Sequence, residues 1–263
     1  MHRFRLAAAT RCFQLPLRQA LRVAADCGAE GVQFDLREEL QPAELNETGR
    51  RDFQHLLDEL GLRVAGTTFT LRRALTDEHE LDRRIAALKQ AMTWSFELRS
   101  PVLTFRMGRL PTDKDGRAGE TLREILDDLA RYANHAGVTL AVTPSQNAAE
   151  DIQTLFSSIQ TGPLGIDFDP AQFALANHKP DAALRTLHGL THHVQLRDAI
   201  SDVEGTSVET PVGEGSVPWI EILATLGEME YSGWLTAIRT QGNDKPGDIR
   251  RAITYVKRLL LGG

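Results

Sequence analysis

The sequence predicts an α/β protein built as a single (β/α)8 barrel of the TIM type, with eight parallel strands, over residues 1–263. Three observations favour this fold. The 263 residues match the ~250 residues typical of such a barrel. Short apolar runs alternate with amphipathic stretches, which implies parallel strands joined by helical crossovers. There are eight such runs, and the glycine-rich fingerprint typical of the rival, an open doubly wound sheet, is missing from the sequence.

The predicted strands are short runs rich in Val, Ile, Leu, Phe and Thr. They span 5–9, 31–35, 62–69, 101–107, 138–143, 164–169, 192–198 and 234–239. Four of the stretches between or after them carry apolar residues at helical spacing, namely 47–60, 80–98, 118–135 and 246–261. The longest polar connection, 199–216, is expected to be a loop that covers the C-terminal face, where barrel active sites lie.

Composition narrows the class of protein. Hydrophobic residues make up 41% of the chain, which is enough for a core, and no linker or composition break divides it. The net charge is −6 with scattered Lys and Arg, so we expect no nucleic-acid partner. No segment is apolar enough to span a membrane, and Cys12 and Cys27 make no disulfide framework. We therefore expect a soluble, cytoplasmic protein without a membrane partner. The sequence leaves open whether the chain forms a homo-oligomer.

Inward residues at the C-terminal ends of barrel strands are the candidates for chemistry. Four predicted strands end in LAVTPSQ, GIDFDPAQ, HHVQLRD and WLTAIRTQG. They place Thr143, Asp169, Gln195 and Ile238 near the mouth of the barrel.

At these residues the chain resembles the sugar-phosphate isomerase/epimerase family, which shares its barrel with xylose isomerase. GVTLAVTPSQNAAEDI is similar to a family strand that ends in a metal-binding Glu, and LGIDFDPAQFAL to a segment with a metal-binding Asp. HVQLRDA resembles the run His-Val-His-Leu-Lys-Asp. VGEGSVPWIEILATLGEMEYSGWLTAIRTQG resembles a closing segment whose last strand ends in Glu. The resemblance is strongest over 137–255.

The family usually holds a divalent cation with two Glu, one Asp and one His. By position, these ligands fall on Thr143, Asp169, Gln195 and Ile238, so only the Asp is kept. A further polar residue of the family, three positions after the Asp, falls on Gln172. Threonine cannot act as a base near neutral pH, isoleucine offers no donor atom, and glutamine is a poor ligand. The resemblance therefore implies that no metal cofactor is bound, or at most a weakly held Mn²⁺, Mg²⁺ or Zn²⁺ at Asp169.

Position along the predicted strands indicates two further groups of candidate site residues. Asp167 and His193 lie two residues before Asp169 and Gln195, so strand alternation predicts that they pair inside the barrel, unless either side chain faces the helices. Arg106, Arg197 and Arg239 lie near the predicted mouth. One of them could neutralise Asp169, they could bind an anionic ligand, or they are solvated charges of the rim. Asp169 itself could instead be a turn residue before Pro170.

The favoured hypothesis is a metal-free relative, catalytically degenerate or altered, that binds a small sugar or polyol, phosphorylated or not, at the mouth. Its candidate catalytic residues are Asp169 and His193. Its candidate ligand contacts are Arg106, Thr143, Gln172, Gln195, Arg197 and Arg239. The alternative is an active metal-dependent isomerase or epimerase with a non-standard site, so whether the chain is an enzyme stays open. A DNA-repair endonuclease would need several more metal ligands and a basic groove.

Overall fold

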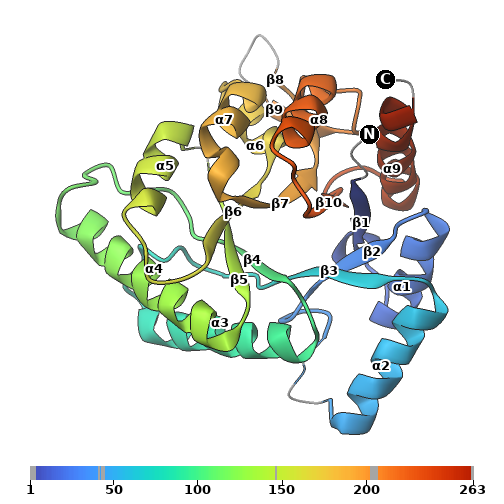
Figure 1. The fold of residues 1–263 in the computed structure, drawn as a ribbon, viewed down its shortest axis with the longest axis horizontal. Coiled ribbons are helices and arrows are strands. Elements are labelled where there is room, and N and C mark those ends of the chain that lie inside the picture. The colour runs from blue at the N-terminus through green and yellow to red at the C-terminus, as the bar shows by residue number, and fades with distance from the viewer. Residues whose placement is uncertain (1–3, 41, 43–44, 146, 202–206, 262–263) are drawn as a thin grey trace.

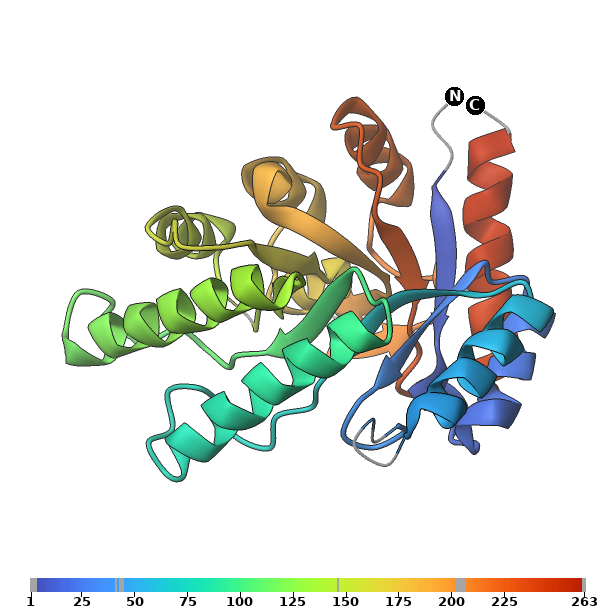
Figure 2. The ribbon, with the colours of Figure 1, turned by 60° about the horizontal axis from the view of Figure 1, so that its bottom comes forward.

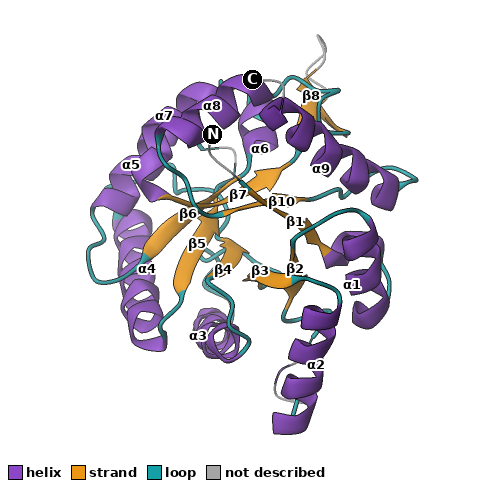
Figure 3. Ribbon diagram, turned by 45° about the vertical axis from the view of Figure 1, so that its right-hand side comes forward, coloured by secondary structure: helices purple, strands orange, loops and turns teal. Residues whose placement is uncertain are grey.

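A computed structural model describes residues 4–40, 42, 45–145, 147–201 and 207–261. Eight parallel strands form a closed barrel in the order β1-β10-β7-β6-β5-β4-β3-β2. Figure 1 labels these elements, and Figure 3 shows the strands surrounded by helices. The predicted (β/α)8 barrel is therefore confirmed.

The barrel strands lie within or close to the predicted runs. They are β1 Arg5–Ala9, β2 Gly31–Asp35, β3 Arg63–Thr68, β4 Val102–Arg106, β5 Thr139–Thr143, β6 Leu164–Phe168, β7 Thr191–Leu196 and β10 Trp234–Ala237. The helices are α1 Leu17–Asp26, α2 Glu47–Glu59, α3 Leu81–Glu97, α4 Arg117–Ala136, α5 Ala149–Ser157, α6 Pro170–Leu175, α7 Pro180–Leu187, α8 Trp219–Glu228 and α9 Lys245–Leu261. Gly137, at φ 74°, ends α4 in the left-handed conformation that glycine adopts without strain.

The connection 199–216 is only partly the loop that the sequence predicts. Residues Asp198–Ser201 (β8) pair antiparallel with Ser207–Thr210 (β9). The turn at 202–206 lies outside the described residues. Both strands pack against α6. The polar composition of the segment hides this hairpin, because a two-stranded ribbon on the surface needs no apolar run.

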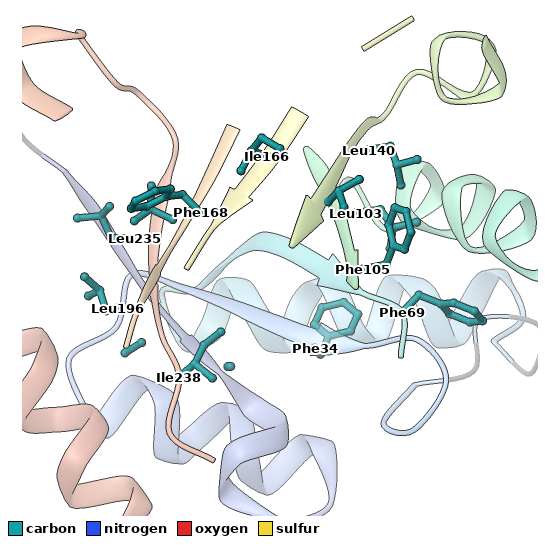
Figure 4. Packing of buried hydrophobic residues seen from close by; sticks show 14 of the residues in the cluster. Phe34, Phe69, Leu103, Phe105, Leu140, Ile166, Phe168, Leu196, Leu235 and Ile238 are labelled. Carbon is teal, nitrogen blue, oxygen red and sulfur yellow. The ribbon is translucent and has the colours of Figure 1, made fainter. Parts of the chain in front are cut away.

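The hydrophobic core lies mainly between the barrel and its helices. Leu103 of β4 is in register with Leu140 of β5, and both are fully buried. Figure 4 shows them beside Ile166 and Phe105 in this layer. Helices α3 and α4 pack side by side over this part of the barrel, as Figure 2 shows. Burial of these apolar faces is the main force that holds the helices on the strands.

The inside of the barrel is apolar at its N-terminal end and polar above it. The buried ring of Trp234 lies against Gly31, where an added Cβ would come within 2.7 Å of the ring. Gly31 is therefore the residue that lets the ring fit. Above it, Gln33 of β2 donates across the barrel to Thr104 of β4, with 3.2 Å between Nε2 and Oγ1. A polar middle layer is unusual, since bulky branched apolar side chains dominate most such barrels.

Asp198 fixes the chain where it leaves β7. Its buried carboxylate accepts from the backbone N–H groups of Ala199, Gly213 and Val217 at 2.9, 2.9 and 3.1 Å. It also accepts from the indole Nε1 of Trp219 at 2.9 Å. One side chain thus ties the start of the hairpin to the start of α8.

We expect Asp198→Ala to lower the free energy of unfolding by about 3–4 kcal/mol, because several buried donors lose a charged acceptor together. Urea denaturation measures this change. Asp52→Ala, on the exposed face of α2, is the control and is expected to stay within about 0.5 kcal/mol of the wild type. A loss at Asp198 as small as that at Asp52 would contradict this role.

Candidate functional site at the mouth of the barrel

Asp167 is the centre of the polar layer. Its side chain is fully buried in β6, and Oδ1 lies 2.7 Å from Nδ1 of His193 in β7. Oδ2 accepts from the hydroxyl of Thr143 and from the amide Nε2 of Gln195, each at 2.5 Å. The strands on either side of β6, β5 and β7, therefore direct polar side chains at one carboxylate. The predicted contact between Asp167 and His193 is present.

His193 is held from both ring nitrogens. Because an ionised carboxylate only accepts hydrogen bonds, Nδ1 of His193 donates to Asp167. Nε2 lies 2.8 Å from the hydroxyl of Thr236 in β10. Both His193 and Thr236 are fully buried, so this histidine positions and balances Asp167 from below.

These contacts set the ionisation of Asp167. Burial alone would raise its pKa, but the charge and hydrogen bond of His193 lower it. The hydrogen bonds from Thr143 and Gln195 act in the same direction. The pKa of Asp167 is therefore below its ordinary value, and the carboxylate stays ionised at neutral pH.

Asp169 has a different environment from Asp167. It follows β6, is fully buried, and its Oδ2 accepts from Nη1 of Arg197. Nη2 of Arg106 lies 3.4 Å from the same oxygen, and the side chain of Arg106 is 44% exposed. Among the three arginines predicted near the mouth, Arg197 thus neutralises Asp169 and Arg106 assists from the rim.

A chain of ion pairs continues from Arg197 to the last helix. Nη2 of Arg197 donates to Oε2 of Glu209 in β9 at 2.7 Å. Oε1 of Glu209 accepts from Nη1 of Arg239 at 3.2 Å, and Nε of Arg239 donates to Asp248 in α9 at 2.8 Å. Arg197 and Arg239 are buried, so the prediction of solvated rim charges is wrong for both.

These ion pairs also set the pKa values of Arg197 and Glu209. Burial alone would lower the pKa of Arg197, but Asp169 and Glu209 raise it above its ordinary value. Burial would raise the pKa of Glu209, but the charge of Arg197 and hydrogen bonds from Arg197 and Thr240 lower it. Both groups are charged at neutral pH, and together they hold the hairpin against the barrel mouth.

A small cavity of about 60 Å³ opens above Asp167. Its floor includes Asp167, Thr143 and Gln195, and its rim includes Arg11 and Arg106. Oε1 of Gln195 is buried with no hydrogen-bond partner among the described residues, and so is Oδ1 of the neighbouring Asp169. Two buried acceptors near the mouth thus have no partner among the described residues, and Gln195 lines the cavity.

The remaining predicted positions do not join this cluster. Ile238 is 3% exposed and belongs to the hydrophobic core, and Figure 4 shows it among buried apolar side chains. Gln172 lies half-buried in α6. Thr143 and Gln195, expected around Asp169, form their hydrogen bonds with Asp167 instead. Within the described ranges, no three His, Cys, Asp or Glu side chains are grouped to hold a metal ion.

Sequence reasoning missed three residues of the site. Thr236 lies two residues before Ile238, so the alternation that predicts Asp167 and His193 could have found it. Glu209 and Asp248 had no such signal, because the hairpin and the last helix bring them to Arg239 only in the folded chain.

None of the described helices is long and apolar enough to cross a membrane.

Fold and site together define a closed parallel barrel with a polar mouth at the C-terminal ends of its strands. Residues 21–259 match the family model described as xylose isomerase-like TIM barrel, and the chain belongs to this family. The family resemblance seen in the sequence is thereby confirmed. Comparison with curated proteins gives no match.

Solved structures of the same fold cover nearly the whole chain. A xylose isomerase domain protein from Planctomyces limnophilus has a TM-score of 0.81 at 20% identity, covering 98% of this chain and 96% of its own. A probable 3-DHS dehydratase, AsbF, from Bacillus anthracis has 0.80 at 12%, covering 97% and 99%. A xylose isomerase-like TIM barrel protein from Mycobacterium smegmatis, in complex with magnesium, has 0.79 at 15%, covering 98% and 97%. At these identities the likeness shows the fold.

The pair of Asp167 and His193 is expected to be strongly coupled in stability. Removing either partner leaves the other buried and unbalanced, so Asp167→Asn and His193→Leu should each cost about 3 kcal/mol. The double variant should cost less than the sum, by at least about 1 kcal/mol. A double-mutant cycle in urea measures this coupling. The exposed pair Arg51 and Glu47 is the control, with an expected coupling below about 0.5 kcal/mol.

Acid should weaken the fold through Asp167. Because its pKa is lowered in the folded state, its contribution to stability is full above the unfolded value of about 3.9 and is lost as pH falls through the folded value. The free energy of unfolding should therefore fall more steeply below about pH 4 in the wild type than in Asp167→Asn. Urea midpoints from pH 7 to pH 3 test this, and parallel curves would show that Asp167 is not responsible.

Proposed function

We propose that the chain is a metal-free member of its family that binds a small sugar or polyol at the barrel mouth and does not carry out metal-dependent isomerisation. The observation that carries the proposal is the hydrogen bond from Arg197 to Asp169. Asp169 is the one position that keeps a family ligand, and a guanidinium now neutralises it.

The donor set does not fit a divalent cation. Ile238 has no ligand atom, and Thr143 and Gln195 direct their donors at Asp167. A cation at Asp169 would also lie next to the charged Arg197, and two like charges in a buried site repel strongly. Magnesium, manganese and zinc all need several oxygen or nitrogen ligands, and among the described residues no three His, Cys, Asp or Glu side chains are grouped to supply them.

The polar groups that remain suit a hydroxylated ligand. The free acceptors of Gln195 and Asp169 call for hydroxyl donors, and Arg106 at the rim is a donor for a ligand oxygen. A phosphorylated polyol would also meet Arg106 with its charge. The cavity of about 60 Å³ is smaller than the roughly 300–1,000 Å³ of typical ligand pockets. It therefore admits one end of the ligand, and the rest would lie against Arg11 and Arg106.

Metal and polyol should act differently on thermal stability. Mn²⁺, Mg²⁺, Zn²⁺ and Co²⁺ should each change Tm by less than about 1 °C, and purified protein should hold far less than one metal per chain. A polyol or sugar phosphate at 100 times its Kd should add about 2.7 kcal/mol, a rise of roughly 5 °C or more. Thermal-shift panels and metal analysis measure both effects.

Gln195→Leu should abolish the polyol effect, because it removes the free acceptor on the cavity floor. Gln54→Leu, on the exposed face of α2, is the matched control and should leave the effect unchanged. One tightly held metal per chain with a Tm rise of several degrees would contradict the metal-free proposal. If no polyol or sugar phosphate in the panel binds saturably, the proposed class of ligand is wrong.

A further inference from the structure

A second cavity, of about 510 Å³, lies beside the barrel mouth and is lined mainly by arginines. Its lining residues are Arg37, Arg72, Arg73, Glu80, Arg83 and Arg84. They come from the segments that follow β2 and β3 and from the start of α3. The cavity is therefore at the C-terminal face, where ligands of this fold bind, and its volume is in the range of small-ligand pockets.

The charge of this cavity is unusual for the chain. Five arginines and one glutamate line it, although the whole protein has a net charge of −6. Arg83 pairs with Glu80 at 2.6 Å and Arg73 with Asp77 at 2.8 Å, and both pairs are largely exposed to solvent. Within the described ranges, no carboxylate is within ion-pairing distance of the other three arginines. The cavity thus keeps a surplus of positive charge.

Arg84 shows that this charge is built into the fold. The residue is 8% exposed, yet its guanidinium bonds to the backbone carbonyls of Asp77 and His79 rather than to a carboxylate. Its Nε has no hydrogen-bond partner among the described residues. Burying a cation without a carboxylate partner is costly, so the uncompensated charge of Arg84 at the cavity wall favours an anion there.

Arg37 is also held in place by neutral groups. Its Nη1 donates to the carbonyl of Thr70 at 2.7 Å, and its guanidinium lies 4.7 Å from the ring centre of Phe69. Phe69 and Thr70 also line the small cavity above Asp167. Arg37 therefore contacts residues of the small cavity, although the two cavities differ in chemistry.

We propose that the arginine cavity binds a small oligoanion, a molecule with two or more phosphoryl or carboxylate groups. Guanidinium groups form paired hydrogen bonds with both kinds of oxyanion, and several arginines around one volume favour a ligand with several charges. The surplus charge also attracts such ligands from solution. This site is separate from the polyol site and does not rest on its existence.

Isothermal titration at 50 mM NaCl tests the proposal with tripolyphosphate, citrate and orthophosphate as probes. At least one of the first two should bind one per chain, and the tighter one identifies the preferred oxyanion. Orthophosphate, with a single group, should bind at least about tenfold more weakly. Raising NaCl to 500 mM should weaken binding severalfold through screening.

Arg72→Gln combined with Arg83→Gln should weaken the binding about tenfold or more, because two exposed cations of the lining are lost. Both residues are exposed, so the fold should persist, and an unchanged Tm confirms it. Arg51→Gln is the matched control, since Arg51 is similarly exposed and pairs with Glu47 on α2. Gln195→Leu should not affect this binding.

Three results would overturn the proposal. They are the lack of saturable binding by tripolyphosphate and citrate, wild-type affinity in the double variant, and an equal loss in Arg51→Gln. The last would show attraction to surface charge in general. Failure of the polyol proposal leaves these results unchanged, because the probes and the variants differ.

Discussion

A carboxylate buried inside a closed barrel must receive hydrogen bonds from its neighbours. Asp167 is such a carboxylate, and this requirement orients the polar side chains around it. Thr143, His193 and Gln195 all satisfy it. Their donors are therefore directed down into the barrel. Thr143 and Gln195 thus bond to Asp167, and Asp169 has another partner.

The partner of Asp169 is Arg197, and the other buried ion pairs of the C-terminal face continue from this arginine. A guanidinium has donors for more than one carboxylate, and Arg197 uses them on Asp169 and Glu209. Glu209 in turn bonds to Arg239, which reaches Asp248. The charges alternate along this chain, so each buried group is balanced by a neighbour. These ion pairs tie the hairpin of β8 and β9 to the barrel mouth.

Much of this architecture could be predicted from the sequence, because barrel strands are apolar runs with a period of two. That period also predicts the Asp167 and His193 contact, and it extends to Thr236. The partners of Asp169 were harder to predict. Nothing local distinguishes Arg197 from Arg239, since the choice depends on strand ends and on a hairpin that a polar segment conceals. Glu209 lies in that segment, and only the fold brings it to the arginines.

The two cavities at the C-terminal face offer different kinds of polar group to a ligand. The cavity above Asp167 is small and offers acceptors beside one half-exposed arginine, whereas the larger cavity offers guanidinium groups held by carbonyls and an aromatic ring. Phe69 and Thr70 line the smaller cavity, and Arg37 of the larger cavity contacts both residues. Arg37 and Arg84 are fixed in the larger cavity by carbonyls and a ring, so their charge favours a ligand with negative charge at this face.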